Sequence, residues 1–432
     1  MQCLLTPMTR RRFISTTGTL AASAALPRVL FANTGTPARL VVVILRGALD
    51  GLAAVPPHGD PDYAGLHRDL AIAAPGAADG ALDLGGMFGL HPSLEFLHER
   101  YSSAELIVFQ AVASPYRDRS HFDGQNVLEN GLAHPLGSGD GWLNRALAIL
   151  PPGASRGADA QRAVAISQNV PLILRGAAPV LSKSPLAAPD VDDDLLERLA
   201  DLYSKDDWFS ARLAEAVQSE KLADRLVEAE EAAAAPSDRH PDPEMRQAQA
   251  VAPTGKVKPA VDRVTGAARM AAAVMRSEGG PEIAVIEASG WDTHANQGGA
   301  QGALAQRLRG LDNALRALAD ELAALWPLTA VLVITEFGRT AAMNGTRGTD
   351  HGTGGCAFLV GGAVRGGRVL TDWPGLKPGA LLDNRDLRPT LDLRSVFKGV
   401  LDEHLHIDDK TLATRVFPDS NEARTLHGLI RA

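Results

Sequence analysis

Short, largely apolar runs recur along the chain and alternate with stretches of helical periodicity. The first run covers residues 40–45 and is bounded by Gly47, and a second covers residues 106–112. Both runs are too short for a helix and have the pattern of strands that are buried on both faces. In the second half of the chain, the segments IAVIEAS, AVLVITEFGRT and CAFLVGGAV repeat this pattern. The runs therefore predict a buried sheet.

Helical periodicity is clearest in the segment that begins at Leu304. Its leucines follow at positions 308, 311, 315, 318, 322 and 325, with spacings that alternate between four and three. This spacing predicts an amphipathic helix of about six turns. Further helices are expected in HPSLEFLHERYSSAE and around residues 393–401. Because strands and helices alternate, we expect an α/β fold with a doubly wound, mostly parallel sheet and with sites at the carboxyl ends of the strands.

Between residues 180 and 260 the pattern changes. The segment is charged, helical in pattern and without strand signals, and its last part is rich in proline. We interpret it as a helical insertion within a domain that spans residues 38–432. The acidic run at residues 192–194 fits a helix N-terminus, where negative charge is favoured, better than it fits a calcium site.

Residues 1–32 have the features of an export signal. TRRRFI places an arginine pair before a weakly apolar stretch that ends in small residues near Ala32. This predicts recognition by the twin-arginine translocase and a periplasmic or otherwise exported protein. The alternative is a membrane anchor, but the stretch is shorter than about 20 strongly apolar residues and contains Ser and Thr. No later run is long enough to span a membrane, so none is expected in the mature form.

Composition and charge narrow the classes of function. The chain has 432 residues, 45% of them hydrophobic and 22% charged, with a net charge of −8. An acidic chain of this kind has no sign of a nucleic-acid partner. The sequence also has no Walker loop, no Gly-x-Gly-x-x-Gly after a strand and no Gly-x-Ser-x-Gly elbow, so nucleotide binding and ordinary serine-hydrolase chemistry lose their usual support.

Residues with functional side chains follow several of the predicted strands. Carboxylates and imidazoles gathered from distant segments suit a divalent cation, with zinc or manganese favoured and calcium as a further option. Because the carboxyl ends of parallel strands share one edge of a sheet, these residues are expected to converge. They are Asp50 after the first strand; Arg117, Arg119, Ser120, His121 and Asp123 after the second; Asp292, His294 and Asn296 after the third; and Glu336, Arg339, Asp350 and His351 after the fourth.

Several of these residues have structural alternatives. Asp50 could cap the short helix around GLAAV, His121 could simply begin a helix, and Glu336 could pair with Arg339. Asp350-His351 is the most specific pair, because the glycines around it allow close approach of the backbone to a ligand. The histidines at positions 58, 67, 91, 98 and 134 are expected at the surface or in packing roles.

The order of these motifs resembles the alkaline-phosphatase superfamily, which includes the sulfatases. More narrowly, LRGALDGL, RSHFDGQNVLENG, GWDTHANQ, ITEFGRT and GTDHGTGG, together with the leader, resemble the exported family called domain of unknown function 1501. The resemblance implies an alkaline-phosphatase-like fold, Asp50 as the first metal ligand and Ser120 as the nucleophile. It further implies Asp292 with His294 or Asn296 as a ligand segment, and His351 as a late ligand.

Two features depart from the superfamily pattern. Glu336-Phe337 stands where an Asp-His pair is usual, so a second metal site would be poorer or absent. The sulfatase signature is not met, because Ser114 lies directly before Pro115 in SPYRDRS, and Cys356 lies far along the chain in a predicted strand. Formylglycine chemistry is therefore not expected.

Together these observations predict an exported metal-dependent hydrolase that acts on an anionic small-molecule phosphate or sulfate ester. Asp50, Asp292, His294, Glu336, Asp350 and His351 supply the candidate metal ligands. Ser120, His121, Arg119 and Arg339 supply the candidate catalytic group, in which arginines neutralise the transferred group. The alternative is a non-catalytic periplasmic binding or assembly factor that uses the same fold.

Overall fold

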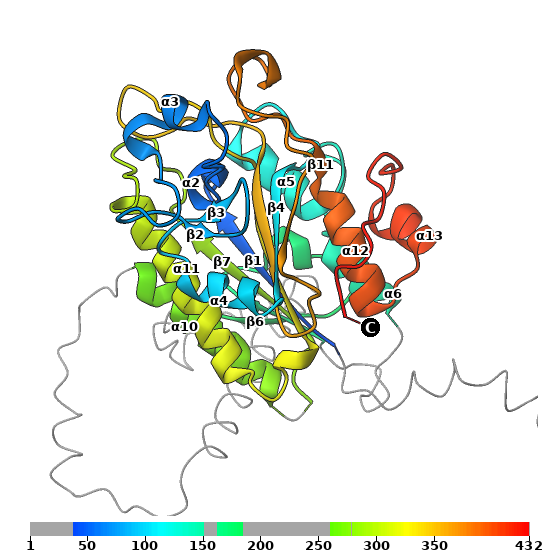
Figure 1. The fold of residues 1–432 in the computed structure, drawn as a ribbon. Helices are drawn as coiled ribbons and strands as arrows, with labels where there is room; N and C mark the ends of the chain where they lie inside the picture. The colour runs from blue at the N-terminus through cyan, green and yellow to red at the C-terminus, as the bar shows by residue number, and fades with distance from the viewer. Residues whose placement is uncertain (1–37, 151–161, 185–259, 278, 432) are drawn as a thin grey trace, which may run out of the picture.

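All five predicted strand segments lie in one sheet. The computed structural model describes residues 38–150, 162–184, 260–277 and 279–431 (Figure 1). The predicted export signal and all but the ends of the predicted helical insertion lie outside the described residues. At the start of that insertion, Leu181–Lys183 forms an edge strand of the sheet.

Nine strands of the described ranges form the central sheet, in the order β10-β4-β9-β8-β1-β7-β5-β6, with β11 paired to β4. All neighbouring strands are parallel except β9, which runs antiparallel to both β4 and β8. The prediction of a mostly parallel sheet is therefore confirmed. The strands are β1 (Arg39–Arg46), β4 (Leu106–Ala113), β5 (Ala163–Ile166), β6 (Leu181–Lys183), β7 (Ile283–Ser289), β8 (Thr329–Thr335), β9 (Gly355–Val360), β10 (Arg368–Leu370) and β11 (Leu391–Asp392); β2 (Leu82–Asp83) and β3 (Gly89–Leu90) form a separate pair.

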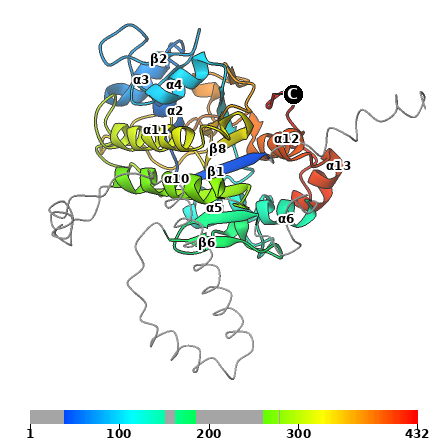
Figure 2. The ribbon, with the colours of Figure 1, turned by 90° about the horizontal axis from the view of Figure 1, so that it is seen from below.

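Helices cover both faces of the sheet (Figures 1 and 2). One face carries α4 (Glu95–Ser102), α10 (Ala260–Arg276) and α11 (Ala303–Glu321); the other carries α5 (His121–Asn130), α6 (Trp142–Ile149) and α12 (Leu393–Leu405). The shorter helices are α2 (Gly51–Ala54), α3 (Tyr63–His67), η2 (Arg68–Leu70), η3 (Leu172–Leu174), η4 (Trp326–Leu328), η5 (Pro378–Ala380), α13 (Asp409–Thr411) and η6 (Leu412–Val416).

The central strand β1 shows why the apolar runs are continuous. Successive side chains of a strand point to opposite faces, and here each face packs into its own core. Burying one such aliphatic side chain stabilises the fold by about 1.5–3 kcal/mol, so no position on either face tolerates a polar residue well. Val41, Val43 and Leu45 lie in the core beneath α10 and α11, whereas Leu40, Val42 and Ile44 lie in the core beneath α6 and α12.

The direction of β9 brings one more loop to the functional edge of the sheet. Strands β1, β4, β7 and β8 run in one direction, so their carboxyl ends share that edge. Because β9 runs the opposite way, the loop before it returns to the same edge. No helix in the described part of the chain is long and apolar enough to cross a membrane.

Asp312 on α11 joins this helix to the start of α4. Its buried carboxylate accepts hydrogen bonds from the backbone N–H groups of Phe96 (2.9 Å) and Leu97 (3.0 Å). Burial raises the pKa of Asp312 to about 6, although these two bonds act in the opposite direction. Since the folded-state pKa lies above the unfolded value, the contribution of Asp312 to stability is largest at low pH and is lost as the pH rises through about 6.

We therefore expect the difference in unfolding free energy between the wild type and Asp312→Asn to change by about 2 to 3 kcal/mol between pH 4 and pH 7, against the wild type at higher pH. Urea unfolding at a series of pH values measures this difference. Asp320→Asn, at an exposed position of the same helix, is the control and should show no such trend. A difference for Asp312→Asn that is constant with pH would contradict the expectation.

Candidate metal centre

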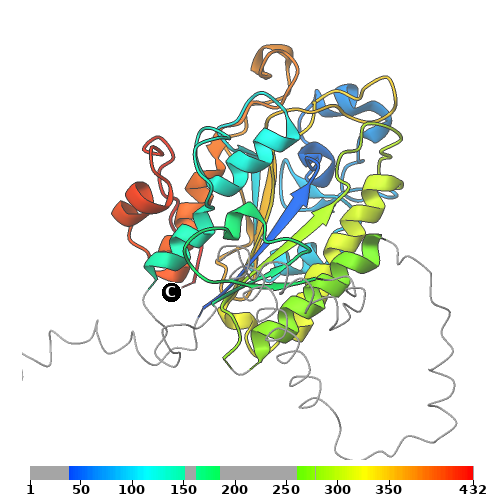
Figure 3. The same cartoon turned by 180° about the vertical axis from the view of Figure 1, so that it is seen from behind.

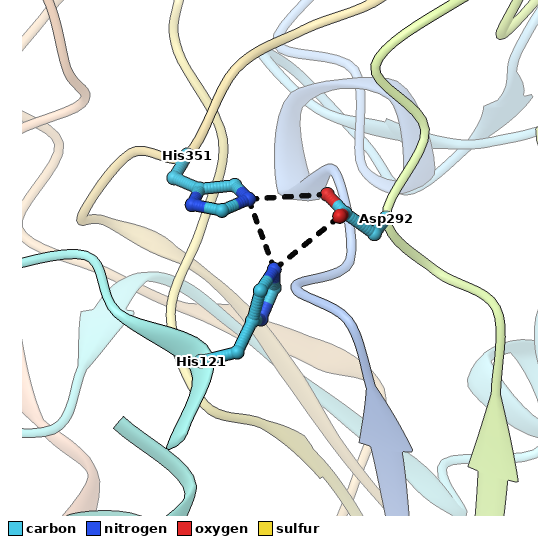
Figure 4. Close-up of side chains that lie close together, drawn as sticks. All are labelled: His121, Asp292 and His351. Carbon is cyan, nitrogen blue, oxygen red and sulfur yellow. Dashed lines mark hydrogen bonds and ion pairs between the residues drawn. The ribbon is translucent and has the colours of Figure 1, made fainter. Parts of the chain in front are cut away.

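Three histidines and one aspartate from three chain segments meet at this edge of the sheet. His121 is the first residue of α5, and Asp292 and His294 follow β7. His351 lies in the loop between β8 and β9. Figure 4 shows His121, Asp292 and His351 pointing toward one another from these separate segments. The ligand atoms of these three residues all lie within 4.8 Å of one another.

The Nε2 atom of His351 is the centre of the cluster. It lies 2.9 Å from Nε2 of His121 and 2.9 Å from Nε2 of His294. Asp292 completes the group: its Oδ1 lies 3.0 Å from Nε2 of His294 and 3.3 Å from Nε2 of His351, and its Oδ2 lies 3.5 Å from Nε2 of His121. The ligand atoms of His121, Asp292 and His351 thus converge, and His294 adjoins them through His351 and Asp292.

The opposite nitrogen of each ring has an acceptor of its own. Nδ1 of His121 lies 2.8 Å from Oε1 of Glu336, and Nδ1 of His294 lies 3.0 Å from Oδ1 of Asp350. Nδ1 of His351 lies 2.9 Å from the carbonyl oxygen of Arg119. Because carbonyls and ionised carboxylates only accept hydrogen bonds, each Nδ1 carries the proton. In a neutral ring the Nε2 atom is then unprotonated and offers a lone pair.

Lone pairs and a carboxylate that face one another fit a cation between them. A proton on one ring satisfies a single N–H···N contact, whereas a divalent metal would satisfy His121, Asp292 and His351 at once. Tetrahedral zinc, with bonds of about 2.0–2.1 Å, places its ligand atoms about 3.3 Å apart. The contacts among His121, Asp292 and His351, at 2.9–3.5 Å, match this spacing. His294 contacts His351 and Asp292 but lies outside the set of ligand atoms that are all within 4.8 Å of one another. Metal-ligating histidines also typically donate their other N–H to a carboxylate or carbonyl, as all three do here.

The electrostatics favour the metal-binding forms of His351 and Asp292, whereas the hydrogen bond with Glu336 raises the pKa of His121. Burial lowers the pKa of His351, which keeps this ring neutral. Burial alone would raise the pKa of Asp292, but the hydrogen bond and the charge of Arg339 lower it. Metal ligands have to be deprotonated, so both effects prepare the centre for a cation.

The polypeptide backbone is shaped around these side chains. Arg119 has a φ of 63°, which is uncommon for a residue other than glycine, and its carbonyl accepts from His351. A Cβ on Gly348 would lie 2.4 Å from the backbone of His294, and one on Gly352 would lie 2.3 Å from the backbone of Arg339. The glycines around Asp350-His351 therefore serve close approach of one backbone segment to another, where the sequence predicted approach to a ligand, and this approach brings the loop to the β7 end.

Glu336 and Asp350 occupy positions behind the histidine rings. Oε1 of the fully buried Glu336 also accepts from the backbone N–H of Gly47 (2.8 Å) and from Nε2 of Gln125 (3.1 Å). Oδ1 of Asp350 also accepts from Nδ2 of Asn344 (3.0 Å). In this geometry both carboxylates, predicted as direct ligands, contact Nδ1 of a ring rather than the convergent Nε2 atoms.

Since outer partners set ring orientation and ligand basicity, changes at Glu336 should weaken metal binding without removing a ligand. We expect Glu336→Gln, which keeps an acceptor for His121, to lower zinc affinity about tenfold, and Glu336→Ala to lower it about 100-fold. Competition with a chromophoric chelator measures both values. Asp123→Asn, on the same helix as His121, is the control. Affinities of both Glu336 variants within a factor of about two of the wild type would exclude this role.

A buried chain of hydrogen bonds connects Asp292 to Asp50. Arg339 is fully buried; its Nη1 donates to Asp292, its Nη2 to the carbonyl of Thr349, and its Nε to Oγ1 of Thr349 (3.2 Å). Oγ1 of Thr349 lies 3.5 Å from Oδ2 of Asp50. The guanidinium therefore holds Asp292 in place, and the alternative pairing of Arg339 with Glu336 is not observed among these contacts.

Asp50 is buried, and both oxygens of its carboxylate have hydrogen-bond partners within the protein. Its Oδ1 accepts from the N–H groups of Leu52 and Ala53 at the start of α2, both at 3.0 Å, and its Oδ2 accepts from Nε2 of Gln297 (2.7 Å). Oδ2 also lies 3.4 Å from Nε2 of the fully buried His67. Burial alone would raise the pKa of Asp50, but the charge of His67 lowers it. The helix-capping alternative thus describes what Asp50 contacts, one step behind the histidine cluster.

The predicted nucleophile lies beside the histidine cluster, whereas two of the predicted arginines are hydrogen-bonded to other parts of the protein. Ser120 immediately precedes His121 at the N-terminus of α5, and its side chain makes no capping hydrogen bond there. Arg117 donates to the carbonyls of Ser114 and Tyr116. Arg119 is paired with Asp383 and Asp386. These two guanidinium groups therefore already have partners within the protein.

His121 is the residue that sequence reasoning placed differently. We predicted it as part of the catalytic group or as a helix start, because Ser120 beside it matched the nucleophile position of the resembled superfamily. Its Nε2 instead joins the candidate ligands. The signal available was the number of histidines at strand ends, three in all, which matches the three imidazoles of a zinc site.

The cluster is open to solvent. The side chains of His294 and Asp292 are 42% and 39% exposed, and those of His351 and His121 are 27% and 23% exposed. Structural zinc sites are closed, whereas catalytic sites keep a position that water or substrate can reach. A metal held by His121, Asp292 and His351 would therefore be within reach of water or substrate.

Comparisons with known proteins give a family without a known function. A family model described as "Protein of unknown function (DUF1501)" matches residues 108–417. No curated protein matches the chain.

Among solved structures, the chain resembles Ps i-CgsB in complex with k-i-k-neocarrahexaose, with a TM-score of 0.36, 8% identity, and coverage of 90% of this chain and 77% of that one. It also resembles the C-terminal periplasmic domain of EcEptC from Escherichia coli in complex with Zn, with a TM-score of 0.33, 9% identity, and coverage of 76% and 73%. A third is the phosphonate monoester hydrolase of Agrobacterium radiobacter, with a TM-score of 0.34, 11% identity, and coverage of 85% and 73%. At these values, function has to be inferred from the side chains of this chain.

Proposed function

The chain belongs to the family of proteins of unknown function DUF1501, and from its site we propose that it is an exported metal-dependent hydrolase of phosphate or sulfate esters. The observation that carries the proposal is the convergence of His121, Asp292 and His351 at a solvent-exposed edge of the sheet, with His294 in contact with His351 and Asp292. The arginine pair in the leader supports export. The order of the motifs supports an alkaline-phosphatase-like, doubly wound arrangement.

His121, Asp292, His294 and His351 would hold one divalent cation. Three imidazoles favour zinc over manganese and disfavour calcium, which prefers oxygen ligands. A bound divalent cation stabilises negative charge that develops on a phosphoryl or sulfuryl oxygen. Phe337, at the position where a second histidine is usual in the resembled superfamily, stacks on the His121 ring with a centroid separation of 5.0 Å. This packing fits a single-metal centre.

Ser120 supplies the proposed nucleophile. In the first step its Oγ forms a bond to phosphorus or sulfur while the ester bond to the leaving oxygen breaks; the serine proton passes to solvent, and the leaving alkoxide takes a proton from solvent. Water then hydrolyses the seryl ester, which releases inorganic phosphate or sulfate and restores the hydroxyl. A serine at the start of α5 also benefits from the N–H groups of the helix end, which favour an anionic ester.

Arginine side chains near the cluster supply positive charge for the transferred phosphoryl or sulfuryl group. Arg119 remains a candidate, because its Nη1 takes no part in the contacts with Asp383 and Asp386. Arg347 is exposed and donates to Oδ1 of Asn296, two residues after His294. Arg339 acts through Asp292, which it holds.

A panel of aryl phosphates, aryl phosphodiesters and aryl sulfates, assayed with added zinc or manganese, tests the proposal. We expect hydrolysis of at least one class, and we expect it to be lost after chelation and restored by zinc. Stoichiometric metal with no hydrolysis of any class would favour the alternative, a binding or assembly factor.

Ser120→Ala separates the roles of hydroxyl and metal. The hydroxyl contributes chemistry and little to coordination, so we expect the variant to lose at least about 100-fold in kcat while its metal content stays unchanged. Ser138→Ala, at a serine outside the cluster, is the control. Activity that survives in Ser120→Ala would indicate direct attack by water and leave Ser120 as a helix-start residue.

A further inference from the structure

A pocket of about 490 Å³ opens along α5, next to the candidate metal centre. It lies between α5 and the segment that carries β5 and η3. In Figure 3 this segment passes beside α5, and η3 contacts the helix. Gln125 connects the two places: it lines the pocket, and its Nε2 donates to the same Glu336 carboxylate that holds His121. His121 and Gln125 are four residues apart on the helix and therefore share a side, whereas Phe122 and Asn126 form the adjoining stripe. The pocket and the metal centre are thus neighbours on one helix.

Amide and hydroxyl groups dominate the polar part of the pocket. The lining includes Asn126, Ser167, Gln168 and Asn169. Among the described residues, no hydrogen-bond partner is found for the side-chain amides of Asn126 and Gln168. A side-chain amide both donates and accepts, so it can pair with the hydroxyl groups of a polyol, which also do both.

The charged side chains of the pocket already have hydrogen-bond partners within the protein. Arg46 donates to Glu129 (2.6 Å) and to Glu287 (2.7 Å), and Oε2 of Glu129 accepts from the N–H of Ile173 (3.0 Å). Arg175 donates to the carbonyl of Val170 (2.8 Å). These two arginines and two glutamates carry formal charges that cancel over the pocket, so the pocket suits a neutral polar ligand better than a second anion.

An exposed aromatic ring stands at the mouth of the pocket. Phe122 lines it and is 84% exposed, although it directly follows the candidate ligand His121. A single exposed apolar residue is common on protein surfaces, but Phe122 differs from Leu136 in lining a pocket beside amide side chains. The C–H face of a sugar ring is a suitable cover, because it is flat and apolar while its edge carries hydroxyl groups for the amides.

We propose that this pocket binds a neutral sugar ring of the substrate, so that the ester hydrolysed at the metal centre is a phosphate or sulfate ester of a saccharide. The role in the reaction rests on the proposed function, whereas the sugar-binding site stands on the pocket alone. Phe122 stacks on the ring, and Asn126 and Gln168 bind its hydroxyl groups. The esterified position then extends past Gln125 toward His121.

Binding of maltotriose, cellotriose and triacetylchitotriose to the mature protein, followed by isothermal titration calorimetry, tests the site without any reaction. We expect at least one of them to bind. Phe122→Ala should weaken that binding about tenfold, and Asn126→Ala about three- to tenfold. Leu136→Ala, at another exposed apolar residue that does not line the pocket, is the matched control and should leave binding unchanged.

His351→Ala separates the two proposals. Saccharide binding that persists in this variant supports a site distinct from the metal centre, and its loss would place the sugar contact at the metal and overturn the inference. Hydrolysis of aryl esters by a protein that binds no saccharide would leave the proposed function intact and reject the sugar site. Saccharide binding without hydrolysis of any ester would support the sugar site and reject the hydrolase.

Discussion

In His351→Ala, the affinity for zinc should fall by more than about 100-fold, and ester hydrolysis should fall with it. His351 contributes the Nε2 atom that lies 2.9 Å from those of both His121 and His294. Its removal therefore takes away a direct ligand. The loss should exceed the roughly 10–100-fold that follows removal of outer-shell partners. Inductively coupled plasma mass spectrometry after dialysis and chelator competition together measure the effect.

The control for His351→Ala is His427→Ala, since His427 is 69% exposed and lies outside the cluster. That variant should keep full metal content and activity. The comparison with Ser120→Ala is equally informative: loss of metal and activity together in one variant, and of activity alone in the other, separates coordination from chemistry. Unchanged zinc affinity in His351→Ala would show that His351 is no ligand.

The second large effect concerns stability. Arg339→Ala should lower the free energy of unfolding by about 2–4 kcal/mol, because its buried hydrogen bonds to Thr349 are lost, whereas the half-exposed Asp292 can be solvated. The guanidinium is fully buried and donates to Asp292 and to both the hydroxyl and the carbonyl of Thr349. Replacement also leaves a cavity the size of a long side chain. Urea unfolding of metal-free protein measures the loss separately from any effect of the metal.

Arg347→Ala is the matched control for this change. Arg347 lies on the same loop, but its guanidinium is exposed and donates to Asn296. Its substitution should change stability by no more than about 0.5 kcal/mol. A similar small change in Arg339→Ala would mean that the buried hydrogen bonds to Thr349 contribute little.

The strands that build the site could be predicted from the sequence, because a strand buried on both faces leaves a continuous apolar run. The direction of a strand, in contrast, does not change its pattern of apolar residues. The run in β9 looks like those in β1 and β8, yet β9 is antiparallel to its neighbours, and only pairing in three dimensions decides this. The short strands β5 and β6 were not predicted, since four and three residues carry too little periodicity.

For the site, position after a strand was an informative signal. It predicted that Asp292, His294 and His351 come from loops at one edge, and these residues do meet there. Position after a strand could not distinguish residues whose side chains face the candidate metal centre from residues that contact the far side of those ligands. Glu336 and Asp350 contact ring nitrogens from the far side, and Asp50 lies one step behind the cluster. Such differences depend on side-chain direction, which the linear order of residues does not contain.

The central claim is that His121, Asp292, His294 and His351 hold one divalent cation. X-ray absorption spectroscopy at the zinc edge, on mature protein purified with zinc present, tests it most directly. We expect one zinc ion per chain, with three imidazole nitrogens and one carboxylate oxygen at about 2.0–2.2 Å, and with one imidazole fewer in any residual zinc of His351→Ala. A protein that retains no stoichiometric zinc or other divalent metal, or a metal shell made of oxygen atoms alone, would contradict the claim.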